Sequence, residues 1–211
     1  MDKSKSASMV YDKIVNQYAE SFHEPSDHID KFLKYLPAQW KILDIGCWTW
    51  TDSNYMDSLW FQVTGIDLSS GMIQFAKKKY PNINFQIWDA RKLAFDKNSF
   101  NWILAACFLI HIPKEDIQQL LSNFNSFLKE NWVIYIALQA WKSDEIFIEE
   151  PFKPDEKLFL NVISYKEIGD LLLKTGFTIL HKFERHPKSK GELDYTKLYV
   201  IAQKSRKPTE T

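Results

Sequence analysis

The stretch Ile42-Leu43-Asp44-Ile45-Gly46-Cys47-Trp48-Thr49-Trp50 decides the fold of this chain. It opens in a short, nearly continuous apolar run, which is typical of a strand covered on both faces. Gly46 then marks a tight chain reversal, because a residue without Cβ adopts positive φ and lets a ligand approach the backbone. The helix expected next offers free backbone N–H groups at its start. The stretch therefore predicts the first strand and the binding loop of an α/β fold.

Strands and helices alternate along the following sequence. Residues 117–128 carry an apolar stripe at helical spacing, and a later helix opens with Ser164 and Glu167 as a capping box and ends before Gly176. Ser69 is a suitable N-cap for another helix. This alternation predicts a mostly parallel sheet flanked by helices. Its further strands are expected at Phe61–Asp67, Ile83–Trp88, Phe100–Phe108 and Val133–Leu138.

The C-terminal part departs from the alternation. Phe177–Arg185 and Lys197–Lys204 have the composition of strands, and only a loop separates them. Without a crossover helix they must pair antiparallel. We therefore expect the sheet to finish in an antiparallel hairpin, an ending that is unusual for a dinucleotide-binding dehydrogenase.

We expect a single domain over residues 1–211, because no repeat or low-complexity linker divides the sequence. Helices are expected over residues 9–36, before the first strand. Long connections in compact domains are usually functional or disordered, so the cap and the insertion are candidate walls or lids of a substrate pocket. The expected parts are an N-terminal helical cap (1–36), a cofactor-binding core (37–139), an insertion or lid (140–163), a C-terminal helix and hairpin (164–204) and a tail (205–211).

Composition argues against several classes of partner. The chain has 27 basic and 27 acidic residues, so it lacks the electrostatic footprint of a nucleic-acid-binding protein. No targeting segment is evident, and the longest apolar run, Trp102–Ile110, is far shorter than the roughly 20 residues of a membrane helix. Cys47 and Cys107 have no metal-ligand spacing. We interpret both as reduced residues of a cytoplasmic protein and predict no metal site, no nucleic-acid partner and no membrane partner.

Two acidic residues follow later strands. Asp67 ends the second expected strand, 21 residues after Gly46, and an acid at about this distance binds ribose hydroxyls in nucleotide-binding folds. Asp89 follows the third strand and could accept a hydrogen bond from an adenine amino group. Each could instead be a helix cap or an exposed turn residue, so neither decides the function by itself.

Taken together, the loop at Asp44–Trp50, Asp67 and Asp89-Ala90 resemble class I S-adenosylmethionine-dependent methyltransferases, and the resemblance runs from about residue 9 to residue 204. It implies a Rossmann-like seven-stranded sheet and S-adenosylmethionine as the cofactor. It also implies a set of residues around that cofactor: Tyr11, Tyr18, Asp44, Gly46, Cys47, Trp48, Asp67, Leu68, Met72, Asp89, Ala90 and Ala106.

The chain departs from the family at its tryptophans. The family has glycine at the positions of Trp48 and Trp50, and usually also at those of Trp60, Trp132 and Trp141. An indole adds bulk where ligand and backbone should touch, and it disfavours positive φ. As written, the loop should not hold the cofactor in the family's pose.

Glycine is scarce here, with 6 residues of 211, whereas tryptophan reaches 8. The average usage of glycine is about 7%. We interpret most or all of the tryptophans as glycines, because the triplet UGA denotes tryptophan in some genetic codes and glycine in others. Some tryptophans could still be ordinary core residues, with Trp88 and Trp102 the first candidates. The eight positions are Trp40, Trp48, Trp50, Trp60, Trp88, Trp102, Trp132 and Trp141.

Three functions are compatible with the sequence. The first is methyl transfer to an oxygen or nitrogen of a small molecule, with His111 as a candidate general base or, alternatively, a structural residue. The second is a binding module on the same fold that has lost cofactor binding through Trp48 and Trp50. The third, an NAD-dependent oxidoreductase, is disfavoured because Thr51 stands where the dinucleotide fingerprint requires glycine.

Overall fold

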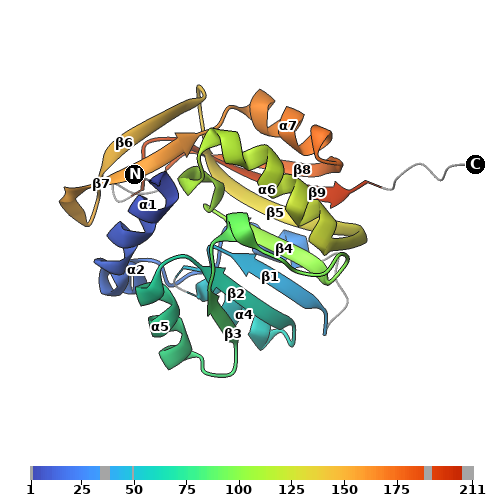
Figure 1. Cartoon of the computed structure of the whole chain (residues 1–211), viewed down its shortest axis with the longest axis horizontal. Helices are drawn as coiled ribbons and strands as arrows, with labels where there is room; N and C mark the ends of the chain where they lie inside the picture. The colour runs from blue at the N-terminus through green and yellow to red at the C-terminus, as the bar shows by residue number, and fades with distance from the viewer. Residues whose placement is uncertain (1, 34–38, 49, 188–191, 206–211) are drawn as a thin grey trace, which may run out of the picture.

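The computed structural model describes residues 2–33, 39–48, 50–187 and 192–205. Its centre is a seven-stranded sheet in the order β3-β2-β1-β4-β5-β9-β8 (Figure 1). From β1, the chain adds β2 and β3 on one side and then β4 and β5 on the other, so that the carboxyl ends of β1 to β5 lie at one edge of the sheet. The strands are β1 (Lys41–Ile45), β2 (Gln62–Asp67), β3 (Asn84–Ile87), β4 (Phe100–Ala106), β5 (Leu128–Ala140), β8 (Phe177–Arg185) and β9 (Thr196–Lys204).

The pairing confirms the predicted fold class. Strands β1 to β5 run parallel, with Asp44 opposite Gly65 on one side and Leu104 on the other. Strand β9 then pairs antiparallel with β5 and with β8. The C-terminal hairpin expected from the missing crossover helix is therefore present.

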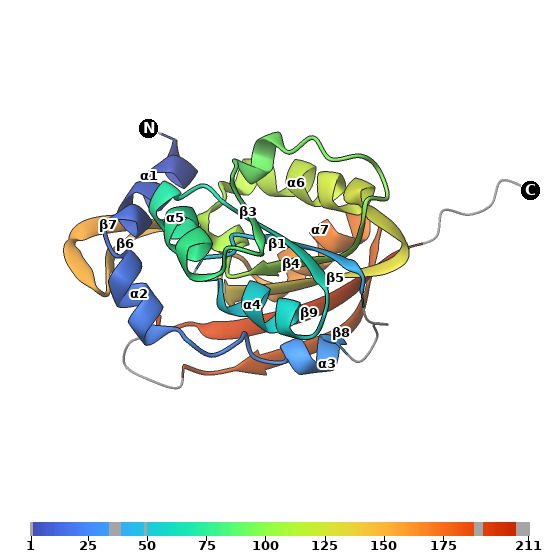
Figure 2. The same ribbon diagram turned by 90° about the horizontal axis from the view of Figure 1, so that it is seen from below.

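Helices cover both faces of the sheet (Figures 1 and 2). Alternate strand residues point to opposite faces, so Leu43 and Ile103 belong to the core cluster that includes α6, whereas Ile42 and Leu104 belong to the cluster that includes α3 and α4. Among the described residues, no helix is long and apolar enough to cross a bilayer. The helices on the sheet are α3 (Ile29–Leu33), α4 (Thr51–Ser58), α5 (Ser70–Lys79), α6 (Lys114–Phe127) and α7 (Tyr165–Lys174).

The N-terminal helices begin earlier than predicted. Helix α1 spans Lys3–Asp12 and α2 spans Val15–Ser21, so the expected start at residue 9 is wrong. The cause is a local cap, since the Asp2 side chain accepts a hydrogen bond from the Lys5 backbone N–H. Residues 34–38, at the end of the expected helical cap, lie outside the described residues.

The expected insertion at residues 140–163 contains a separate two-stranded antiparallel sheet, β6 (Asp144–Glu150) and β7 (Lys153–Val162). Figures 1 and 2 both show it beside α1 and α2, at one end of the main sheet. Leu158 and Leu160 of β7 are buried in the same core cluster as Val10 of α1. The cap and the insertion therefore pack together, and their role as a lid stays a proposal.

The connection from α6 into β5 differs from the sequence prediction. Strand β5 starts at Leu128, directly after α6, so the expected start at Val133 is wrong and the apolar helical stripe ends one residue before Leu128. The left-handed residue is Asn131, with a φ of 67°, and Trp132 has no positive φ. The ladder between β4 and β5 shifts register between Phe100 and Trp102, which shows that the strand accommodates an irregularity here.

Candidate functional site

Two cavities lie at the carboxyl ends of the parallel strands, where open α/β sheets bind ligands. The large cavity has a volume of about 300 Å³ and the small cavity about 50 Å³. Asp44, Ala106 and Gln139, at or near the ends of β1, β4 and β5, line the large one. Asp67 and Asp89 line the small one. A shared wall borders both cavities and consists of Tyr11, Gly46, Trp48, Cys107 and His111.

Asp67 connects the end of β2 to the loop after β1. Its carboxylate accepts hydrogen bonds from the backbone N–H groups of Trp48 at 3.1 Å and Ser69 at 2.8 Å. Burial raises the pKa of Asp67 to about 6, although these hydrogen bonds act in the opposite direction. The carboxylate has further acceptor capacity, so it could also bind hydroxyl groups of a ligand in the small cavity.

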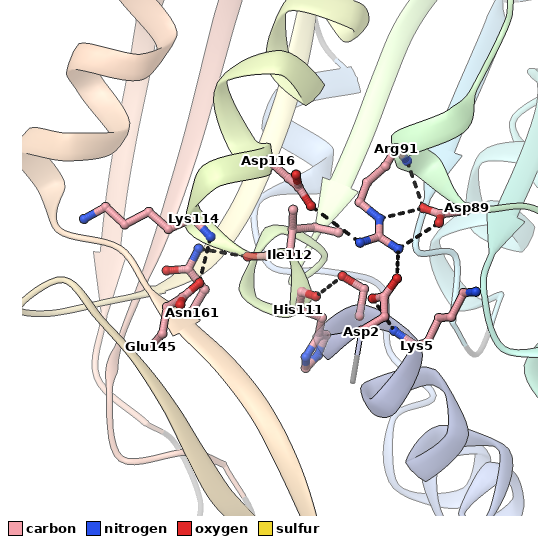
Figure 3. Close-up of polar contacts among 11 residues, drawn as sticks. Asp2, Lys5, Asp89, Arg91, His111, Ile112, Lys114, Asp116, Glu145 and Asn161 are labelled. Atoms are coloured by element: carbon pink, nitrogen blue, oxygen red, sulfur yellow. Dashed lines mark hydrogen bonds and ion pairs between the residues drawn. The ribbon is translucent and has the colours of Figure 1, made fainter.

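Asp89 is paired with an arginine of its own turn (Figure 3). Arg91 donates to Asp89 from Nε at 3.0 Å and from Nη2 at 2.8 Å, and also donates to Asp2 at 2.7 Å. Burial raises the pKa of Asp89, but the hydrogen bonds from Arg91 outweigh burial and lower it. Asp89 is therefore an anchored carboxylate that lines the small cavity, and Arg91 connects it to Asp2, the N-cap of α1.

The loop after β1 turns sharply toward β2. The N–H groups of Gly46 and Cys47 both donate to the Ile66 carbonyl, at 2.8 and 3.0 Å. Gly46 has a φ of 68°, and a Cβ there would meet Phe108 at 2.9 Å, so the position requires glycine. Asp44 lies beneath the loop and accepts from the Ser53 hydroxyl at 2.5 Å. Burial, followed by the charge of Asp52, raises the pKa of Asp44.

His111 has a defined tautomer in the shared wall. Its Nδ1 lies 3.0 Å from the Phe159 carbonyl, which can only accept, so Nδ1 carries the proton. The Nε2 lone pair therefore accepts the Tyr11 hydroxyl proton at 2.8 Å. Burial lowers the pKa of His111 to about 4, although the bond to Phe159 opposes this shift. At neutral pH His111 is an uncharged base whose lone pair meets a tyrosine hydroxyl.

Tyr18 links the N-terminal helices to the β6–β7 sheet. Its hydroxyl donates to the fully buried Glu150 at 3.1 Å, and its ring packs edge-on against Trp48 with centroids 4.8 Å apart. The indole also contacts the rings of Tyr11 and Phe22, at 5.7 and 5.6 Å. Trp48 thus belongs to an aromatic cluster in the middle of the site.

This cluster does not fit a cofactor that extends through the site. Trp48 belongs to the wall between the cavity with Asp44 and the cavity with Asp67. The small cavity is well below the 300–1,000 Å³ that ligand sites usually enclose. Trp48 and Trp50 have φ values of 48° and 61°, a conformation that costs a residue with a side chain roughly 1–2 kcal/mol. The expectation that indoles would stand in glycine-like backbone is correct at both positions.

The structure brings most of the predicted cofactor residues together. Met72 is different, because it is fully buried in the core and lines neither cavity. Sequence reasoning missed Gln139, whose Oε1 is buried without a hydrogen-bond partner. Its only signal was its place at the end of a strand. The predicted residues that line the large cavity, the small cavity or both are Tyr11, Tyr18, Asp44, Gly46, Cys47, Trp48, Asp67, Leu68, Asp89, Ala90, Ala106 and His111.

Similarity to known proteins agrees with this arrangement. Residues 42–131, which include the loop and both strand-end acids, match the methyltransferase domain family. A putative methyltransferase of Bacillus subtilis, YqeM, is 27% identical over 157 residues, which cover 71% of this chain and 64% of the relative. The chain thus spans slightly less than two thirds of that relative's length.

The fold is shared with solved structures. A methyltransferase from Methanosarcina mazei has a TM-score of 0.75 at 20% identity, over 87% of this chain and 100% of that chain. The cyclase SpnF has a TM-score of 0.77 at 14% identity, over 98% of both chains. A cyclase with this fold shows that the fold does not fix the reaction. Residues 42–131 thus match a methyltransferase domain, and the chain shares its fold with solved structures described as S-adenosylmethionine-dependent methyltransferases.

Proposed function

We propose that the protein transfers a methyl group from S-adenosylmethionine to an oxygen or nitrogen atom of a small molecule. One observation carries this proposal: the residues implied for the cofactor lie at two cavities with a common wall, at the carboxyl ends of β1 to β4. Asp67 and Asp89 suit the adenosine end, and Asp44 and Ala106 suit the methionine end. The proposal applies to a chain in which the side chain of residue 48 does not separate these ends.

The pair Tyr11 and His111 is positioned to take a proton from the acceptor. Tyr11 donates to Nε2 of His111, so its oxygen keeps lone pairs that can accept a proton from an acceptor O–H or N–H group. As the Tyr11 oxygen receives that proton, its own proton passes to Nε2. Both residues line the large cavity. His111 is neutral at physiological pH, so its Nε2 lone pair is available, although burial lowers its pKa to about 4 and makes it a weak base in the free protein.

Gln139 supplies a means of orienting the acceptor. Only 9% of its surface is exposed, and its Oε1 has no partner although the residue lines the large cavity. A buried carbonyl oxygen without a partner favours a ligand that brings a hydrogen-bond donor. We infer an acceptor that places an O–H or N–H group against Gln139. The free thiols of Cys47 and Cys107 are compatible with a reducing, cytoplasmic location.

A second candidate function is supported by Trp48. In the chain with the indole, the divided site favours a binding module that holds no cofactor and uses the large cavity for another ligand. Calorimetry with S-adenosylhomocysteine distinguishes the two functions. Tight binding to the unaltered chain would reject the cofactor-free module.

The cofactor assignment is tested with Asp67→Ala in a Trp48→Gly background. We expect the affinity for S-adenosylhomocysteine to fall at least about 100-fold, because hydrogen bonds to a charged group contribute roughly 1.5–3 kcal/mol each. Asp57→Ala is the matched control, since Asp57 is exposed on α4 and lines neither cavity. An affinity that is the same in both variants would remove Asp67 from the binding site.

A further inference from the structure

Two helices in this protein are followed by a left-handed residue directly after the C-cap, but that residue differs between them. After helix α4, Trp60 follows the C-cap with a φ of 68°. The Trp60 N–H donates to the Asp57 carbonyl at 2.9 Å, and the Phe61 N–H donates to the Met56 carbonyl at 3.2 Å. These two bonds define a Schellman motif, whose left-handed residue is usually glycine. After helix α7, the corresponding position is Gly176. It has a φ of 82°, and its N–H lies 3.2 Å from the Leu173 carbonyl. The backbone at Trp60 is therefore that of a glycine.

Nothing around Trp60 explains an indole there. Its side chain is 81% exposed, so it contributes little to the core. Trp60 is also not isolated, because three of the eight non-glycine residues with positive φ in the described ranges are tryptophans: Trp48, Trp50 and Trp60. The usual non-glycine residues in this conformation are asparagine and aspartate. Tryptophans with positive φ thus occur at one exposed helix end and at two positions of the loop after β1.

A different misfit marks a tryptophan with ordinary φ. Trp102, on the central strand β4, is fully buried with its ring centroid 3.1 Å from that of Phe32, far inside the usual 4.5–7 Å of aromatic pairs. Its Nε1–H is buried without a partner. Trp88 is the contrast, since it meets Phe95 at an ordinary 5.2 Å. Indoles thus misfit at several unrelated sites, but not at every tryptophan.

We propose that positions 48, 50 and 60 are glycine positions, and that the functional chain carries glycine at all three. A side chain at residue 48 is then absent from the wall shared by the two cavities, and the cavities join into one site that reaches from Asp44 to Asp67. The joined site rests on the proposed function. The glycine assignment does not, because Trp60 lies outside both cavities.

The assignment is tested first at Trp60, by comparing thermal unfolding of Trp60→Gly and Trp60→Ala. Both variants remove the exposed indole, but only glycine removes the cost of the left-handed backbone. We expect Trp60→Gly to melt about 2–8 °C above Trp60→Ala. Equal midpoints would overturn the glycine assignment. Peptide mass spectrometry of the protein from its own organism gives a direct check: glycine masses at 48, 50 and 60 support the assignment, and tryptophan masses overturn it.

The joined site is tested with Trp48→Gly and S-adenosylhomocysteine in a calorimeter. Trp50 is left unchanged in this test, because it is buried, stacks on Phe75 at 4.5 Å and lines neither cavity, so that the change in binding reports on residue 48 alone. We expect Trp48→Gly to bind at least 100-fold more tightly than the unaltered chain. Equal binding would overturn the role of the indole as a barrier. A stabilising Trp60→Gly together with no binding by Trp48→Gly would support the glycine assignment and overturn the proposed function.

Discussion

The two cavities are built in different ways. The small cavity is closed mainly by residues at the ends of neighbouring strands, with Asp67 and Asp89 held by hydrogen bonds from their own turns. The large cavity is assembled from segments far apart in the sequence, so that Tyr18, Gln139 and Lys197 face one space. The small cavity, the proposed cofactor end, therefore depends on local turn chemistry, whereas the large cavity, the proposed acceptor end, depends on how α2, the β6–β7 sheet and the C-terminal hairpin pack.

The largest expected effect is the pH dependence of the free energy of unfolding that His111, in the shared wall, contributes. The folded-state pKa of His111, about 4, lies below its ordinary value of 6.5. The neutral form is therefore favoured in the fold, and its contribution to stability is present above pH 6.5 and is lost as the pH falls toward 4. Between pH 7 and pH 5 we expect this group to cost about 2 kcal/mol of unfolding free energy.

Urea unfolding of the unaltered chain and of His111→Gln, at both pH values, measures this contribution. The glutamine variant has no titrating group at residue 111. Between pH 7 and pH 5, its free energy of unfolding should therefore fall by about 2 kcal/mol less than that of the unaltered chain. An identical fall in both proteins would mean that His111 is not held neutral between the cavities.

An intermediate effect is expected on the affinity for S-adenosylhomocysteine, through Asp67 in the small cavity. Asp67 has a raised pKa of about 6 in the free protein, so it is largely protonated at pH 5 and ionised at pH 7. In the proposed site, ribose hydroxyls would donate to the carboxylate, so binding should favour the ionised form. We expect the affinity of Trp48→Gly for S-adenosylhomocysteine to rise about tenfold from pH 5 to pH 7. Calorimetry in two buffers of different ionisation heat should show proton release near pH 6, and a pH-independent affinity would contradict this role of Asp67.

The smallest effect is expected on the stability of the unliganded protein, through Gln139 in the large cavity. Gln139→Met replaces a buried amide, whose Oε1 has no partner, with an apolar side chain of similar length. We expect the unliganded protein to gain about 1 kcal/mol of stability, because an unsatisfied buried polar group is removed. Gln139→Asn, which keeps the amide on a shorter side chain, should give no such gain. Destabilisation by methionine would show that the glutamine serves the core and not a ligand.

The sequence predicted the small cavity better than the large one. Gly46, Asp67 and Asp89 were found because each lies where a strand ends, and parallel strands bring those ends to one edge. The contact between Tyr11 and His111 joins residues 100 positions apart, and no local pattern encodes it. Gln139 gave no signal beyond its place at the end of a strand, because being unpaired is a property of its surroundings. The start of α1 was missed although the cap at Asp2 is local, since the polar residues after it masked the helix.

By itself, the sequence determined the alternation of strands and helices, the antiparallel ending of the sheet and the need for glycine-like backbone after β1. These follow from periodicity, loop length and the sterics of a single turn, which act over a few residues. The tertiary structure alone decided that Trp48 lies in the wall between two cavities, that His111 is a neutral base and that Trp60 completes a helix-capping motif. The physical reason is that burial, tautomer and cavity shape depend on atoms brought from distant parts of the chain.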